Sequence, residues 1–304
     1  MAIIPRLRAL LGASLMLLAC LPAWAEQGEL KPFILAAKTS GDMATTVAET
    51  KQKLSNAGFE VVGEYSPYAN ASIVIVTNDA LKANAAASEL GAYGAGQRVA
   101  VTKVGNELQI AYTNPVYMAH AYRMKGDLAD VRAQLAKALG DQGQFGPDQG
   151  KTPEQLHKYH YKIFMPYFDD QIKLAVHKDY ASAIKAVEAG LAGGKHGASK
   201  VYRIDIPGKE ETVFGVSLKA TGEDDKALDE SFVMSEIDFK DLRSTAHLPY
   251  DLVVSGQTVY TLSARFRIAI NFPDLSMMGA NSFMNIMATP DAVQAALEKT
   301  AEGK

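Results

Sequence analysis

The sequence contains the stretch Ile110-Ala111-Tyr112-Thr113-Asn114-Pro115 and a close variant of it, Ile268-Ala269-Ile270-Asn271-Phe272-Pro273. In each copy an apolar run ends at a proline, which has no N–H to donate to a strand ladder. We therefore interpret both stretches as the ends of β-strands. Because internal repeats determine the architecture of a chain, this pair is the starting point for predicting the fold.

A second match lies downstream of each proline. Two predicted amphipathic helices, residues 127–137 and 289–299, have a valine, a leucine and a lysine at the same spacing. Each helix has an apolar stripe that needs a partner surface. We therefore predict two related domains, residues 26–140 and 162–304, connected by a linker and a short helix over residues 141–161.

Strands and helices are mixed between these anchors without strict alternation. Residues 71–77 contain the unbroken β-branched run Ile73-Val74-Ile75-Val76, which is typical of a buried strand, and Gly105-Asn106 is a hairpin turn between two further strands. We also interpret residues 231–237 as a strand and residues 251–270 as a long hairpin. The predicted fold class is α+β, with two related domains that each pack helices on one face of an antiparallel sheet.

The N-terminus has the pattern of an export signal. Arg6 and Arg8 precede an apolar core, and Ala23-Trp24-Ala25 has the small residues of a cleavage site. We expect residues 1–25 to be a signal peptide, cleavage before Glu26, and a periplasmic protein. The alternative is a lipoprotein attached through Cys20, and only in that case do we expect contact with a membrane.

Cys20 is the only cysteine of the 304 residues. A chain cleaved before Glu26 would have neither a disulfide nor a thiolate nucleophile. Removal of the signal would change the formal net charge from −3 to −5, since Arg6 and Arg8 are its only charged residues. A mildly acidic chain without a basic run is a poor nucleic-acid binder, so no nucleic-acid partner is expected.

Residues 98–115, together with Tyr117 and the pair Ala121-Tyr122, resemble the bacterial domain-of-unknown-function 302 family. The resemblance covers residues 31–140 and extends more weakly to residues 173–302. It implies a small α+β domain that often forms dimers and has no settled activity. The second copy lacks an equivalent of Tyr117, so a site at that position would not be shared by both copies.

No catalytic motif is present. The sequence has no Gly-x-Ser-x-Gly elbow, no phosphate loop and no dinucleotide fingerprint. His157 and His160, in a predicted helix with Asp169 and Asp170 nearby, could share a metal, but a solvated helix face is the simpler interpretation. We therefore predict no cofactor and no metal site, and keep an enzyme with an unrecognised site as an alternative.

Methionine-rich segments follow both prolines. The first contains Met118, His120 and Met124, and the second contains Met277, Met278, Met284 and Met287. Methionine suits adaptable packing and apolar ligand or partner surfaces, and its thioether with histidine can hold Cu(I). The leading hypothesis is an exported, non-enzymatic protein that binds a small ligand or a protein partner. A periplasmic copper-binding or other metal-binding protein is an alternative.

The two copies are expected to pack against each other. A short linker gives tethered domains a high effective concentration, so we predict an intramolecular pseudo-dimer. The segments after the two prolines are the candidates for its junction. The difference in their lengths could open a cleft there, and its predicted ligand-binding residues are Tyr117, Met118, His120, Met277 and Met278.

Overall fold

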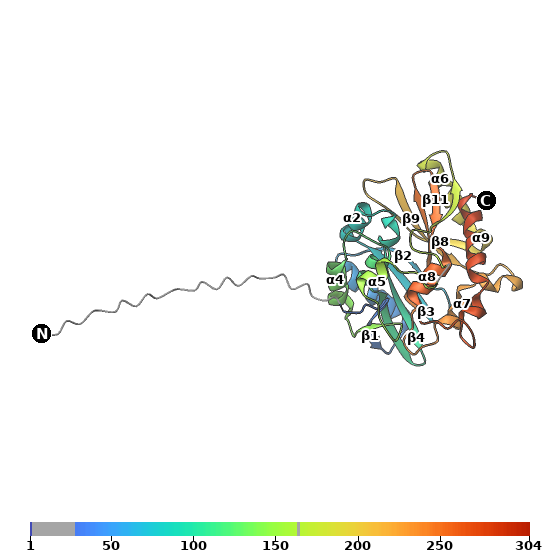
Figure 1. Ribbon diagram of the computed structural model, residues 1–304. Helices are drawn as coiled ribbons and strands as arrows, with labels where there is room; N and C mark the ends of the chain where they lie inside the picture. The colour runs from blue at the N-terminus through green and yellow to red at the C-terminus, as the bar shows by residue number, and fades with distance from the viewer. Residues whose placement is uncertain (2–27, 163–164) are drawn as a thin grey trace.

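The structure is a computed structural model that describes Met1 and residues 28–162 and 165–304. The predicted signal peptide beyond Met1, with Cys20 and the cleavage site, lies outside the described residues. No helix among the described residues is long and apolar enough to cross a membrane. The fold class is α+β, as predicted, with two antiparallel sheets and helices around them (Figure 1).

The first half of the chain builds a six-stranded sheet in the order β2-β3-β4-β5-β1-β6. Its strands are β1 (Phe33–Thr39), β2 (Glu60–Tyr65), β3 (Ala71–Thr77), β4 (Gln97–Val104), β5 (Glu107–Thr113) and β6 (Gln144–Phe145). Its helices are α1 (Met43–Asn56), α2 (Asp79–Ala87), α3 (Pro115–Ala121) and α4 (Ala129–Leu139), and the short α5 (Pro153–His157) follows.

The second half builds a five-stranded sheet in the order β7-β11-β10-β9-β8. Its strands are β7 (Ile172–Val176), β8 (Ala198–Asp205), β9 (Glu211–Leu218), β10 (Tyr250–Ser255) and β11 (Thr258–Thr261). Its helices are α6 (Tyr180–Leu191), α7 (Glu230–Ile237), α8 (Ala264–Asn271) and α9 (Thr289–Ala301), with a 3₁₀ turn η5 (Phe283–Ile286) before the last helix.

The two sheets have the same connectivity apart from the short β6. In each, the first strand ends up beside the fifth, and the second to fifth strands follow one another across the sheet. A helix joins the first and second strands, α1 in one half and α6 in the other. Two helices follow the fifth strand in each half: α3 and α4 in the first half, and α8 and α9 in the second.

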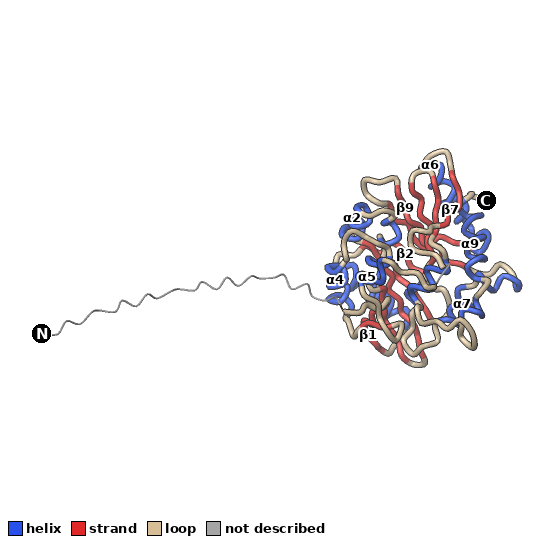
Figure 2. Tube along the Cα trace, viewed as in Figure 1, coloured by secondary structure: helices blue, strands red, loops and turns tan. Residues whose placement is uncertain are grey.

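Alternation along β3 shows how the first sheet is covered. Side chains of a strand point to opposite faces in turn. Val74 and Val76 join a buried cluster with residues of α1 and α4, while Ile73 and Ile75 join a cluster that includes residues of the second sheet. The first sheet thus has helices on one face and the other half of the chain on the opposite face. In Figure 2 the strands run through the middle of the molecule with helices outside them.

Helices α6 and α9 cover the second sheet and lie on the opposite side of the molecule from α2 and α4 (Figure 1). Their close approach depends on Gly190 of α6. A Cβ at this position would lie 2.1 Å from the backbone oxygen of Thr300 in α9. The missing side chain lets the two helix backbones touch.

An ionic cluster is buried between the two sheets. Arg98 of β4 and Arg267 of α8 both donate to the Asp251 carboxylate of β10, and the Tyr202 hydroxyl donates to the same group at 2.7 Å. All four residues are buried. An isolated charge in such a place would be costly, so Arg98 in the first half and Asp251 in the second each depend on the other for an ionic partner.

The structure corrects two sequence-based assignments. Residues 268–271 are not a strand end but the second half of α8, so the predicted hairpin over residues 251–270 ends at Thr261. By connectivity, the end of β5 at Thr113 corresponds to the end of β11 at Thr261. The segment predicted as a strand at residues 231–237 is helix α7, with Asp229 as its N-cap.

Candidate functional site

An open cavity of about 650 Å³ lies in the second half of the chain. We call it the polar pocket. Its walls come from the segment before β7, from the junction of β11 with α8, and from the first turns of α9. The lining residues are His160, Met165, Pro166, Tyr167, Asp170, Ile172, Ser263, Arg265, Pro290, Asp291 and Gln294.

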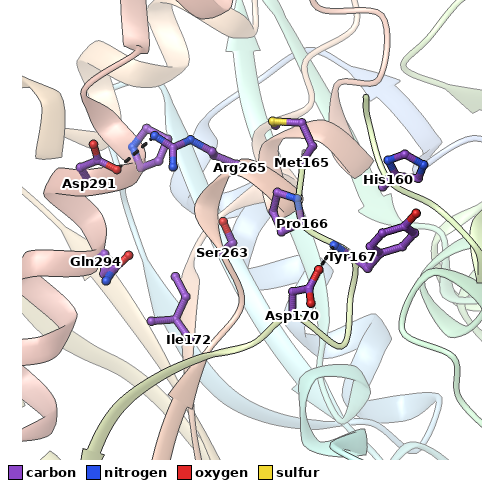
Figure 3. Close-up of a pocket in the computed structure, with 11 residues that line it drawn as sticks. His160, Met165, Pro166, Tyr167, Asp170, Ile172, Ser263, Arg265, Asp291 and Gln294 are labelled. Carbon is purple, nitrogen blue, oxygen red and sulfur yellow. Dashed lines mark hydrogen bonds and ion pairs between the residues drawn. The ribbon is translucent and has the colours of Figure 1, made fainter. Parts of the chain in front are cut away.

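Local structure explains how one wall is held. The Tyr167 backbone N–H donates to the Asp170 carboxylate at 2.9 Å, which closes a tight turn. The His160 ring lies beside the Tyr167 ring, with 4.5 Å between their centroids, and its Nδ1 is 3.0 Å from the backbone oxygen of Lys162. Figure 3 shows these two rings on one side of the pocket and Arg265 with Asp291 on the other.

The opposite wall is made by the first turns of two helices. Ser263 is the N-cap of α8 and makes no side-chain capping bond, so its hydroxyl is not used by the helix. Pro290 and Asp291 lie in the first turn of α9, where proline and an acidic residue are both favourable. The positive ends of two helix dipoles therefore lie at this wall, which favours negative charge in the pocket.

Arg265 is the main cation of the pocket. Its Nη2 donates to the Asp291 carboxylate at 3.1 Å, and the two side chains are 40% and 73% exposed. An ion pair with this exposure contributes at most about 1 kcal/mol. Breaking the Arg265–Asp291 pair should therefore cost little.

A smaller, apolar pocket adjoins the polar one. It has a volume of about 40 Å³, and Met165 and Arg265 line both pockets. Helix α8 and the segment after it provide most of its wall; the other lining residues are Tyr161, Ile268, Ala269, Phe272, Leu275, Met277 and Phe283. Because the two pockets share these lining residues, we refer to them together as the joined pocket, with a polar part and an apolar part.

The structure separates the five ligand-binding residues predicted from the sequence. Tyr117 and Met118 are buried, and His120 is partly buried on α3. Met277 lines the apolar pocket, while Met278 is 70% exposed and lines neither part of the joined pocket. These five side chains therefore do not line one described cavity.

Tyr117 connects the halves in another way. The last four carbonyls of a helix have no partner within the helix. At the end of α8, Ile270 accepts a hydrogen bond from the Tyr117 hydroxyl at 2.6 Å, and Ala269 accepts one from the Tyr159 hydroxyl at 2.8 Å. Side chains from outside the second sheet thus cap its helix.

The residues considered for a metal are also apart. Helix α5 ends at His157, so His160 does not share a helix face with it. Asp169 pairs with Arg123 at 2.8 Å, while His160 and Asp170 line the polar pocket. No group of three or more His, Cys, Asp or Glu residues among the described positions could hold a metal ion.

Sequence reasoning missed the pocket residues of the α8 and α9 wall. Ser263 and Arg265 lie inside a segment that was interpreted as a strand, and nothing in a strand marked them as ligand-binding residues. Pro290-Asp291 did indicate a helix start, but not that a second helix began beside it. Only the fold brings these two helix starts together.

The chain was compared with protein-family models, curated proteins and solved structures, and none of them matches. The resemblance to the domain-of-unknown-function 302 family therefore stays a prediction.

Proposed function

We propose that this chain binds a small amphipathic molecule with a carboxylate at one end. The observation that carries the proposal is the position of Arg265, which lines both the polar and the apolar pocket. A carboxylate would accept hydrogen bonds from its guanidinium, and a short apolar group would contact Ile268 and Phe272. Guanidinium groups suit carboxylates because their N–H groups match the two oxygens.

The surroundings of Arg265 support an anionic head group. The N-termini of α8 and α9 both face the polar pocket, and one N–H of Arg265 bonds to an exposed carboxylate that a ligand can displace. Ser263 adds a hydroxyl at the same wall as Arg265, and His160 adds an imidazole on the opposite side of the pocket. Small-molecule sites typically have a small number of polar groups that converge on a partly apolar cavity.

Binding without catalysis is supported better than the alternative of an enzyme. A hydrolytic site would need a nucleophile in hydrogen-bond contact with a base. Within the described residues, no hydrogen bond joins the Ser263 hydroxyl to His160 or Asp170. His160 instead contacts the Lys162 backbone and the Tyr167 ring.

The remaining parts of the proposal concern location and origin. The signal-like N-terminus supports a periplasmic protein, with a lipid anchor at Cys20 as the alternative. The shared strand order supports an origin of the two halves by duplication and their packing as an intramolecular pseudo-dimer. The buried Arg98–Asp251 pair between the sheets is consistent with that arrangement.

Calorimetric titration with hexanoate and with hexanol tests the proposed ligand class. We expect hexanoate to bind and hexanol, which lacks the carboxylate, to bind at least roughly tenfold more weakly, since a charged hydrogen bond contributes about 1.5–3 kcal/mol. Arg265→Gln should weaken hexanoate binding by a similar factor. Equal binding of hexanoate by wild type and Arg265→Gln would refute the role of Arg265.

The matched control is Arg203→Gln. Arg203 lies on β8, is 36% exposed, and pairs with Glu188 and Asp205. It thus has the exposure and ion pairing of Arg265 without lining the joined pocket. Its substitution should leave hexanoate binding unchanged.

A further inference from the structure

Four methionines are exposed on one short segment between α8 and α9. Met277, Met278, Met284 and Met287 are 41%, 70%, 50% and 56% exposed. Large apolar side chains are rarely this exposed, and the described part of the chain has only four others, Met1, Tyr167, Val176 and Phe239. A cluster of thioethers at the surface therefore needs an explanation other than core packing.

The backbone places three of these residues close to one another. Met284 and Met287 are three residues apart at the 3₁₀ turn η5, and side chains at this spacing lie above one another in a 3₁₀ helix. The Met284 N–H donates to the backbone oxygen of Met277 at 3.2 Å. The backbones of Met277 and Met284 are therefore in contact, and Met278 and Met287 follow closely along the chain.

The segment is anchored while the methionines face solvent. Ser282 and Ile286 are buried, and the Phe283 N–H donates to the Ser276 carbonyl at 2.8 Å. The buried residues fix the course of the backbone, so the thioethers belong to an ordered segment. Their flexible side chains can still adjust to a shared ligand.

We propose that Met277, Met278, Met284 and Met287 form a binding site for a soft monovalent cation, Cu(I) or Ag(I). Thioether sulfur is a neutral, soft donor that prefers such ions to hard divalent cations. Three or four sulfurs on one segment match the low coordination numbers of these ions. Thioethers carry no proton near neutral pH, so the site should bind metal without releasing protons.

The proposed site overlaps the joined pocket only at Met277. Met277 lines the apolar pocket, whereas Met278, Met284 and Met287 line neither part of it. A triple substitution of these three to leucine removes most of the sulfur donors and leaves the pocket lining intact. Leucine has a similar volume, so the segment should keep its course.

The experiment is competition for Cu(I) with bicinchoninate under anaerobic conditions, using the full mature chain. We expect wild type to withdraw one equivalent of Cu(I), with a sulfur-only first shell in X-ray absorption. The triple variant Met278→Leu, Met284→Leu and Met287→Leu should lose this complex but keep wild-type thermal stability. Bound Ag(I) should also protect the same three methionines of wild type from peroxide oxidation, measured by mass spectrometry.

The control variant is Met43→Leu with Met234→Leu, which removes two methionines outside the segment and should keep full Cu(I) uptake. No uptake by wild type would overturn the proposal. Equal uptake by wild type and the triple variant would overturn it as well, because the ligands would then lie elsewhere in the chain. A first shell of nitrogen would also overturn it, because the six histidines would then be the ligands.

Discussion

The Nη2 of Arg98 on β4 lies 2.6 Å from Oδ2 of Asp251 on β10, and both side chains are less than 5% exposed. These are corresponding strands of the two sheets, each the fourth in its own half. Arg267 shares the same carboxylate oxygen, so one acidic side chain faces two buried guanidinium groups. The junction between the halves therefore depends on Asp251.

Asp251→Ala should destabilise the protein by about 3–5 kcal/mol, because it leaves Arg98 and Arg267 buried without their anion. Urea denaturation followed by circular dichroism measures this change. The control is Glu107→Gln, which removes an exposed pair with Lys38 at 3.0 Å and should cost at most about 1 kcal/mol. Similar losses for both variants would show that the buried pair does not hold the junction.

Stability should fall as the pH rises through the neutral range. Burial at the start of α7 raises the pKa of Glu230 from 4.5 to about 8, and burial raises that of Asp238 from 3.8 to about 7. The folded state then keeps protons that the unfolded state has released. The stabilisation from each group is complete below its unfolded pKa and is lost as the pH rises towards about 8. Each group then lowers the unfolding free energy by up to about 1.4 kcal/mol per pH unit.

Glu230→Gln replaces the protonated carboxyl with a neutral amide. It should therefore reduce the pH dependence of the unfolding free energy between pH 7 and 8, and Glu230→Gln with Asp238→Asn should nearly abolish it there. Below that window the buried His247, whose pKa is lowered by burial, makes stability change in the opposite sense. Urea denaturation across this range measures the slope. Glu64→Gln on the surface is the control and should retain the wild-type slope; an unchanged slope in the double variant would contradict the assignment.

The sequence predicted the α+β class and the strands β3, β4 and β5 of the first sheet, because apolar runs and turn residues are local signals. It misassigned residues 268–271 because a short apolar run fits a buried helix as well as a strand. The presence of asparagine and proline after that run strengthened the wrong match with residues 110–115. The position of Ser263, two residues after Thr261, was the available sign that a helix begins there.

Tyr117→Phe should cost about 1–3 kcal/mol, although it removes only one oxygen atom. The Tyr117 hydroxyl donates to the Ile270 carbonyl at 2.6 Å inside the core, and its loss leaves that carbonyl without a partner. Thermal unfolding and urea denaturation measure the cost. Tyr167→Phe, at an exposed ring, is the control; a Tyr117→Phe variant as stable as this control would show that water replaces the hydroxyl.

The candidate site was less predictable than the fold. Arg265, Ser263 and Asp291 come from the starts of two helices that are more than twenty residues apart in sequence. Their convergence depends on how α8 and α9 pack on the second sheet, which is a tertiary property. Met277 was predicted as a ligand contact for its chemistry, and the structure places it in the apolar pocket.

The edge strands β2 and β8 come from different sheets and meet at Gly63. A Cβ added there would lie 2.5 Å from the backbone oxygen of Val201 and 2.8 Å from Cβ of Tyr202. The nearest of these atoms belongs to the backbone, so the contact cannot be relieved by a rotamer change. Gly63→Ala should therefore separate the two edges and cost about 1–3 kcal/mol, as overpacking does in a core.

The control for Gly63→Ala is Gly222→Ala, where no atom lies within 4 Å of the added Cβ and the backbone is extended. This variant should stay within about 0.5 kcal/mol of wild type. Urea denaturation compares the two, and amide hydrogen exchange in β2 and β8 shows where the damage occurs. Faster exchange in both strands of Gly63→Ala is expected, since they lose the same contact. Wild-type stability and exchange in Gly63→Ala would mean that the two sheets tolerate a wider gap at this edge.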